Sequence, residues 1–190
     1  TTTAALKKLG VTLVMNMHVD DFANDQVMLS DGTSISSKNL IWAAGVTGKI
    51  FEGVPEHSYG RGKRLLVDEY NRVKGMDDVY AIGDTCLQAG DAPYPDGHPQ
   101  VAQVAIQQGK NLADNFIRKV AGKAEVPFAY TDKGSMAIIG SNQAVADLST
   151  PNIHLNGFIA WLTWLFVHLM SLITYRNRAR TFWNWTVAYL

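Results

Sequence analysis

The stretch Val79-Tyr80-Ala81-Ile82-Gly83-Asp84 decides the fold class of this 190-residue chain. An apolar run typical of a buried strand ends in a glycine followed by an acid. A glycine at a strand end lets a ligand approach the backbone closely. In open α/β sheets, ligands bind at the carboxyl ends of the strands. An isolated Gly-Asp is more often a plain turn, so the neighbouring segments decide between a ligand site and a turn.

Short apolar strands, glycine-rich loops and helices alternate along the chain, and this order predicts an α/β fold. Asp31-Gly32 is a strong hairpin signal, and Gly10 marks the end of a first helix. We expect strands at residues 11–15, 26–29, 40–45, 65–67 and 79–82, a strand pair at 128–140 and 144–148, and helices at 4–9, 99–120, 156–174 and 178–190.

The helix predicted from Pro99 to about Val120 has a polar stripe and an apolar side. The stripe contains Gln100, Gln103, Gln107, Asn111, Asp114 and Arg118, and the other side contains Val101, Ala105, Ile106, Leu112, Phe116 and Ile117. Periodicity by itself favours a solvent-exposed stripe. Gln103 and Gln107 are four residues apart, so both can reach one pocket. Gln108 falls at the edge of the apolar side, and its role stays open.

Composition excludes several classes of function. The net charge is zero, so the sequence shows no basic surface for nucleic acid, and we expect no nucleic-acid partner. Cys86 is the single cysteine, which rules out a disulfide framework and a cysteine-based metal site. A lone cysteine fits a protein of the reducing cytoplasm.

Residues 151–190 differ from the rest of the chain. They contain three arginines, no acidic residue and four of the five tryptophans. Residues 157–173 carry one ionisable side chain, His168, which we interpret as packed or interfacial. A spanning helix needs about 20 apolar residues, so we expect two amphipathic helices lying in a membrane interface. A helical hairpin that forms a dimer interface is the alternative.

The order of Trp42–Gly45, Val67-Asp68, Val79–Asp84 and Ala102-Gln103 resembles the two-dinucleotide-binding-domain flavoprotein reductases. More narrowly, four segments resemble the type II NADH:quinone oxidoreductases. They are Ala102–Gly109, Phe128–Gly140, Ala160–Leu162 with Val167–Leu169, and Tyr175–Arg178. The resemblance implies a flavoenzyme on the inner face of a membrane. Such an enzyme passes a hydride from NADH to FAD and two electrons on to a quinone, without pumping protons.

The same resemblance assigns roles to individual residues. Asp84, after Gly83, would bind the ribityl hydroxyls of FAD, and the backbone of Ala102 and Gln103 would lie at the pyrimidine end of the flavin. Gln103 and Gln107 would border the quinone pocket, which makes them the candidate catalytic residues. A helix N-terminus carries about half a positive charge, and this favours the negative charge of a reduced flavin there.

The resemblance also implies a domain organisation. Residues 1–39 would end the NADH-binding domain, residues 40–150 would form the C-terminal part of the FAD-binding domain, and residues 151–190 would anchor the protein to a membrane. The 190 residues contain no GxGxxG fingerprint. We therefore expect a fragment that does not bind FAD or NADH tightly by itself. The parent protein is expected on the cytoplasmic side of the cell inner membrane as a peripheral protein and possible homodimer.

Two other functions stay open at this point. A sulfide:quinone reductase shares the fold and a membrane tail, but it needs a redox pair of cysteines, and Cys86 has no second cysteine in this sequence. The second alternative is that the fragment itself is a non-catalytic module for membrane binding or dimerisation.

Overall fold

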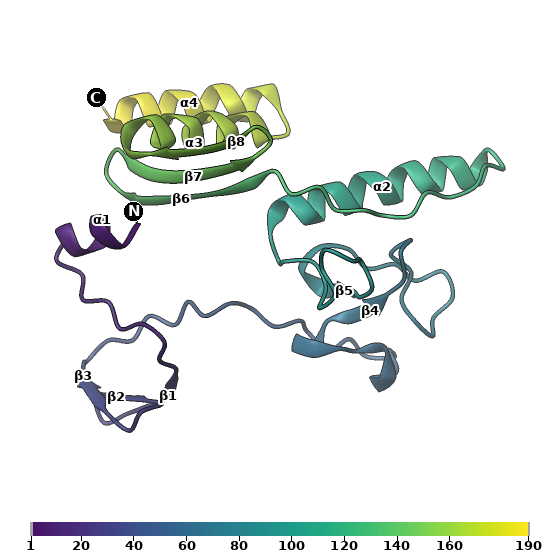
Figure 1. Cartoon of the computed structure of the whole chain (residues 1–190). Helices are drawn as coiled ribbons and strands as arrows, with labels where there is room; N and C mark the ends of the chain where they lie inside the picture. Colours follow the sequence, from purple (N-terminus) through teal and green to yellow (C-terminus); the bar gives the residue numbers. More distant parts are fainter. Residues whose placement is uncertain (1, 190) are drawn as a thin grey trace. The chain divides into compact units, whose positions relative to one another are not determined.

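The computed structural model describes residues 2–189, which form two compact units. The first unit comprises residues 2–41 and 133–189, and the second unit is Trp42–Asp132. The chain contains both helices and strands (Figure 1), so the predicted mixed α/β class is confirmed.

The first unit begins with helix α1 (Thr2–Lys8) and a three-stranded antiparallel sheet, β1 (Val19–Ala23), β2 (Gln26–Leu29) and β3 (Ser34–Ser36). Strand β2 has the predicted bounds, and its buried residues Val27 and Leu29 alternate with exposed Met28. This period of two is that of a sheet with one covered face.

The hairpin turn predicted at Asp31-Gly32 is confirmed. The Asp31 carboxylate accepts hydrogen bonds from the Thr33 backbone N–H at 2.9 Å and from the Thr33 hydroxyl at 2.6 Å. Two predicted strands are wrong, at residues 11–15 and 40–45, because no strand in residues 2–189 pairs with either segment. Instead of being buried, Ile41 is 91% exposed.

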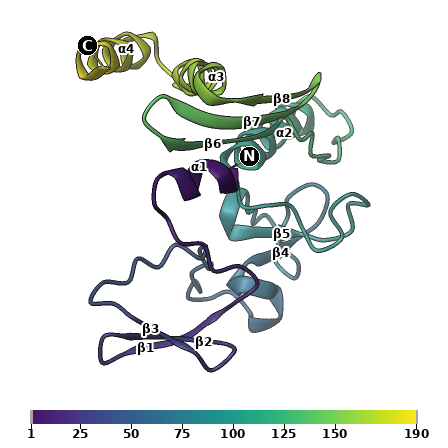
Figure 2. The same ribbon diagram turned by 60° about the vertical axis from the view of Figure 1, so that its left-hand side comes forward.

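The first unit continues with a second antiparallel sheet, covered on one face by a helix (Figure 2). Its elements are β6 (Gly134–Gly140), β7 (Gln143–Ser149), β8 (Asn152–Asn156), α3 (Gly157–Ser171) and α4 (Tyr175–Tyr189). Trp161 on α3 packs on Ala144 and Ala146 of β7, together with Ala160. The small alanine side chains leave room for the indole, which is 6% exposed.

The predicted strand pair corresponds to β6 and β7, although residues 128–133 lie outside the strand. Strand β8 was not predicted. Its apolar residues Ile153 and Leu155 alternate with polar ones over only five residues. The two C-terminal helices are confirmed as α3 and α4, with α4 beginning at Tyr175 rather than Arg178.

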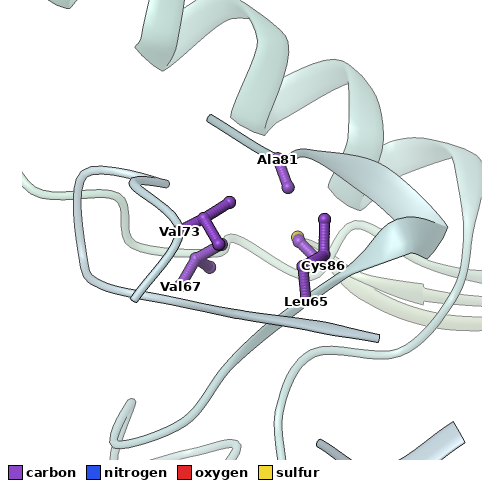
Figure 3. Packing of buried hydrophobic residues seen from close by; sticks show 5 residues of the cluster. All are labelled: Leu65, Val67, Val73, Ala81 and Cys86. Carbon is purple, nitrogen blue, oxygen red and sulfur yellow. The ribbon is translucent and has the colours of Figure 1, made fainter. Parts of the chain in front are cut away.

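The second unit is built around two parallel strands, β4 (Leu65–Val67) and β5 (Cys86–Gln88). Short 3₁₀ turns surround them at Glu56–Ser58, Arg61–Lys63 and Gly83–Thr85, and the helix α2 spans Ala102–Val120. The hydrophobic core of the second unit contains Leu65, Val67, Val73, Ala81 and Cys86 (Figure 3). Strand β4 is confirmed, whereas β5 falls in a region where no strand was expected.

The predicted strand at residues 79–82 is wrong. Val79 C=O accepts a hydrogen bond from Val73 N–H at 2.8 Å, and Ala81 N–H donates to Asn71 C=O at 3.0 Å. These bonds form one isolated bridge with the preceding chain rather than a ladder. The segment is nevertheless extended, and Ala81 lies in the core.

Helix α2 begins at Ala102, three residues after the predicted start, and buries a different face from the one expected. Its buried residues are Val104, Gln108 and Asn115. By contrast, Ile106 is 64% exposed and Ile117 is 68% exposed. The predicted burial of the apolar side is therefore wrong. The face of α2 that is buried depends on hydrogen bonds as well as on apolar packing.

Candidate functional site

The Gly83-Asp84 turn starts the 3₁₀ segment that packs against the first turns of α2. Gly83 has φ +69°, a backbone conformation that L side chains rarely adopt. A Cβ at Gly83 would also lie 3.2 Å from the Cβ of Ala105 on α2. Both the conformation and the close approach of the helix therefore require glycine here.

Two glutamines hold the backbone of this turn. The Gln108 side-chain oxygen Oε1 accepts a hydrogen bond from Gly83 N–H at 2.7 Å. The Gln100 Nε2 donates to Asp84 C=O at 3.1 Å. The turn is thus tied to α2 itself and to Gln100, two residues before that helix.

The Asp84 carboxylate is exposed and makes no hydrogen bond or salt bridge within residues 2–189. Helix α2 begins at Ala102, and the side chain of its N-cap residue Val101 makes no capping hydrogen bond. First-turn N–H groups without a cap carry the positive end of the helix dipole. The structure therefore brings Gly83, Asp84 and Ala102 into one unit with an acceptor and donors that a ligand can use.

Gln103 and Gln107 both contact the segment that runs beside α2. Gln107 bonds the backbone of Thr131 twice, donating from Nε2 to the carbonyl at 2.9 Å and accepting the N–H at Oε1 at 3.1 Å. Gln103 Nε2 lies 3.4 Å from Asp132 Oδ1, and the Tyr130 hydroxyl lies 3.4 Å from the same oxygen. The two glutamines share one helix face, and their role at a quinone pocket stays a prediction.

The polar stripe of α2 is not simply solvated. Asn115 is 1% exposed, and its amide bonds both the N–H and the C=O of Val126. Asn111 donates to the same carbonyl, and the Arg118 Nε donates to Ala124 C=O at 2.6 Å. Side chains of α2 therefore supply the hydrogen bonds that a neighbouring strand would give to the extended segment 124–132. Asn111 and Arg118 are intermediate in exposure and thus only partly solvated, whereas Asp114 is exposed as predicted.

A cluster of buried polar side chains holds the loop after β5, and the sequence analysis did not predict it. Arg64 donates to Cys86 C=O at 2.7 Å and to His98 C=O at 3.2 Å. His98 is 2% exposed, and its Nε2 lies 2.9 Å from Asp91 Oδ2. Its ring packs against those of Tyr94, Phe128 and Tyr130. A histidine in a Gly- and Pro-rich loop gave no periodic signal of burial.

Cys86 does not have the surroundings of a reactive thiol. It is 1% exposed, and burial raises the pKa of its thiol above the usual value. Reactive cysteines instead lie in accessible sites that favour the thiolate. Its neighbours are the amide of Gln108 and the carbonyl of Gly83. Cys86 thus packs behind the Gly83 turn.

Helices α3 and α4 expose much apolar surface. Between them lies a groove of about 320 Å³ lined by Trp161, Leu162, Leu165, Phe166, Leu169, Phe182, Trp185 and Thr186. Ile173 is 96% exposed and Trp183 is 66% exposed. His168 is exposed, and its ring stacks on Trp164 of the same helix with ring centroids 3.7 Å apart. Among the helices of residues 2–189, none combines the length and the apolar character needed to cross a bilayer.

Two family models match the chain. Residues 1–109 match the pyridine nucleotide-disulphide oxidoreductase model, and residues 133–190 match the NDH2 C-terminal domain. Together they leave unmatched only the segment that contains most of α2 and the extended chain beside it.

Curated relatives resemble nearly the whole chain. The type II NADH:quinone oxidoreductase Ndh of Mycobacterium tuberculosis is 35% identical over 98% of this chain and 41% of its own length. The internal alternative NAD(P)H-ubiquinone oxidoreductase A1 of Arabidopsis thaliana is 33% identical over 97% of this chain and 39% of its own. The chain therefore spans about two fifths of the length of these relatives.

Solved structures share the fold. NDH2 of Plasmodium falciparum in complex with NADH superimposes with a TM-score of 0.79 at 21% identity, over 95% of this chain and 52% of its own. The sulfide:quinone oxidoreductase of Aquifex aeolicus gives a TM-score of 0.64 at 14% identity, over 93% and 44%. The chain belongs to the pyridine nucleotide-disulphide oxidoreductase family, and its residues 133–190 match the model of the NDH2 C-terminal domain.

Proposed function

We propose that this chain is part of a type II NADH:quinone oxidoreductase, in which it supplies one side of the FAD site and the membrane-binding region. One observation carries the proposal: a Gly83-Asp84 turn tied to α2, with a free carboxylate beside an uncapped helix start. The names of the two curated relatives, an NADH:quinone and an NAD(P)H-ubiquinone oxidoreductase, support it.

The residues of the turn fit FAD. Asp84 offers an exposed carboxylate that can accept hydrogen bonds from ribityl hydroxyls. Gly83 has no side chain to obstruct them, and Ala102 offers a backbone N–H at the helix start. When bound, FAD would supply hydride acceptance from NADH and electron transfer to a quinone.

The start of α2 would contribute electrostatically. Its N-terminus carries about half a positive charge, and Val101 brings no side-chain oxygen to neutralise it. Ala102 and Gln103 would therefore stabilise negative charge at the pyrimidine end of a reduced flavin. A low-dielectric, preorganised dipole is an effective way to stabilise such charge.

Gln103 and Gln107 would border the quinone. Their amides are held in place by Asp132 and Thr131, so their orientation is set by the second unit itself. An amide N–H can donate to a quinone carbonyl, which becomes more basic as it is reduced. Both residues are intermediate in exposure, between the buried and the solvated faces of α2.

The membrane-binding region would be residues 151–190, following an NADH-domain end at residues 1–39 and an FAD-domain part at 40–150. Exposed apolar side chains of α3 and α4 would enter the lipid, and the acid-free composition with three arginines suits an anionic membrane surface. We place the parent protein at the cytoplasmic face of the cell inner membrane as a peripheral protein and possible homodimer.

The half-reactions of the flavin-loaded enzyme test the role of Gln103. In Gln103→Leu, we expect flavin reduction by NADH to persist while reoxidation by quinone slows by about tenfold or more, the usual effect of losing one hydrogen bond to a reacting group. Stopped-flow absorbance of the flavin measures both steps. Lys110→Leu, at an exposed position of the same helix, is the control. Equal loss of both half-reactions would contradict the quinone role.

A further inference from the structure

Gln108 is a fully buried amide in the middle of a helix. Its side chain is among the largest that the structure buries almost completely, at 1% residue exposure. Burying an amide is unfavourable unless its hydrogen bonds are made inside the protein. The partners of Gln108 therefore indicate what this side chain is for.

Within the described residues 2–189, the side-chain hydrogen bonds of Gln108 all go to Gly83 and Cys86. Its Oε1 accepts the Gly83 N–H at 2.7 Å. Its Nε2 and Oε1 lie 3.4 and 3.5 Å from the Sγ of Cys86. That thiol in turn lies 3.3 Å from the carbonyl oxygen of Gly83. Gln108 and Cys86 together thus engage both the N–H and the C=O of Gly83.

Besides Gln108, local bonds hold the Gly83-Asp84 turn: the Cys86 N–H donates to the Gly83 C=O, and the Thr85 hydroxyl donates to the Ile82 C=O at 3.0 Å. Gly83 has no side chain, and its positive φ places it outside any strand. Gln100 holds the Asp84 carbonyl on the other side of the turn. The Asp84 carboxylate itself makes no bond within the described residues 2–189. Its position therefore depends on the backbone bonds at its two sides, and the shorter and more deeply buried bond is that of Gln108.

We propose that Gln108 is the positioning residue of the flavin site: its amide oxygen holds the Gly83 N–H and thereby places the Asp84 carboxylate for the ribityl hydroxyls. This inference rests on the proposed function. It assigns a role to a residue that itself contacts no flavin, and it separates Gln108 from its neighbour Gln107, which bonds Thr131 instead.

Asn115 provides a matched control. It is also a buried amide of α2, with 1% exposure, and it also bonds an extended backbone segment, but its partner is Val126 rather than Gly83. Asn115→Leu should therefore lower stability without moving the Asp84 carboxylate. Gln108→Met keeps the length of the side chain while removing the amide oxygen. Gln108→Glu keeps an oxygen acceptor for Gly83.

The experiment uses the full-length parent enzyme and measures the dissociation constant of FAD, the visible circular dichroism of the bound flavin and the exchange rate of the Gly83 amide hydrogen. In Gln108→Met, we expect faster exchange at Gly83, a changed flavin dichroism and an FAD dissociation constant raised about tenfold, the scale of one hydrogen bond. Gln108→Glu should retain the parent values. Asn115→Leu should retain them too, despite its lower stability.

Unchanged flavin binding and dichroism in Gln108→Met would overturn the proposal, as would an equal loss of flavin in Asn115→Leu. Should Gln108→Met fail to fold, Gln108→Glu still decides, because a folded Gln108→Glu protein with weak flavin binding and an unprotected Gly83 amide contradicts the assigned role. None of these readouts needs a quinone. A parent enzyme that binds FAD but reduces no quinone would refute the proposed function and leave this inference standing.

Discussion

Asn115→Leu removes the best-buried link between α2 and the extended segment beside it. In the native chain, Asn115 Nδ2 donates to Val126 C=O at 2.9 Å, and Val126 N–H donates to Asn115 Oδ1 at 2.8 Å. Leucine has a similar volume but neither donor nor acceptor. The substitution therefore removes these two hydrogen bonds, and a longer one from Asn115 Nδ2 to Asn111 Oδ1 at 3.3 Å, without a large change in side-chain volume.

The expected loss of stability follows from the two hydrogen bonds between Asn115 and Val126. A typical intramolecular hydrogen bond contributes about 1 kcal/mol to stability, so the free energy of unfolding should fall by about 2 kcal/mol. Val126 is 44% exposed, so water can satisfy its freed backbone groups and the loss should not become much larger. With a urea dependence of about 2 kcal/mol per molar, the unfolding midpoint should drop by about 1 M.

Urea denaturation followed by circular dichroism measures the midpoint, and hydrogen exchange measures the Val126 amide directly. Asp114→Asn is the matched control at the preceding, exposed position of α2, and its effect should stay within about 0.5 kcal/mol. An unchanged midpoint with a still-protected Val126 amide would refute the conclusion that side-chain amides of α2 hold the segment.

Burial, together with the Asp132 carboxylate, raises the pKa of Tyr130 to about 12. The folded chain thus favours the protonated phenol of Tyr130, so this contribution to stability is present below the unfolded pKa of about 10 and is lost as the pH rises towards 12. Ultraviolet titration should show a late tyrosinate from Tyr130, besides that of Tyr94, whose pKa burial also raises, and Asp132→Asn should shift the Tyr130 signal earlier. Gly134 has φ +99°, and a Cβ there would collide with the Asp147 carbonyl. Gly134→Ala should therefore lower the melting temperature more than Gly157→Ala, whose φ is +67° but whose Cβ would meet nothing within 4 Å; equal shifts would contradict the steric argument.

Sequence patterns predicted the elements whose structure depends mainly on their own residues. The Asp31-Gly32 turn, strand β2 and the C-terminal helices follow from turn chemistry or from apolar periodicity alone. The segments at 40–45 and 79–82 have equally apolar sequences but form no ladder, because a strand also needs a neighbour to pair with. A pattern of residues cannot specify that neighbour.

The buried face of α2 shows a second limit. Periodicity assigned burial to Ile106 and Ile117, whereas the structure buries Gln108 and Asn115. The partners of these amides are backbone groups at Gly83 and Val126, far away in sequence. Hydrogen bonds to distant backbone reverse the usual preference for apolar burial. The candidate ligand residues of the turn were predictable, but the side chain that holds the turn was not.

The central claim is that the Gly83-Asp84 turn and α2 belong to an NADH:quinone oxidoreductase. Steady-state quinone reduction by the purified, flavin-loaded parent enzyme, with NADH and sulfide compared as electron donors, tests it most directly. The account predicts quinone reduction with NADH and none with sulfide. Quinone reduction with sulfide alone would contradict it.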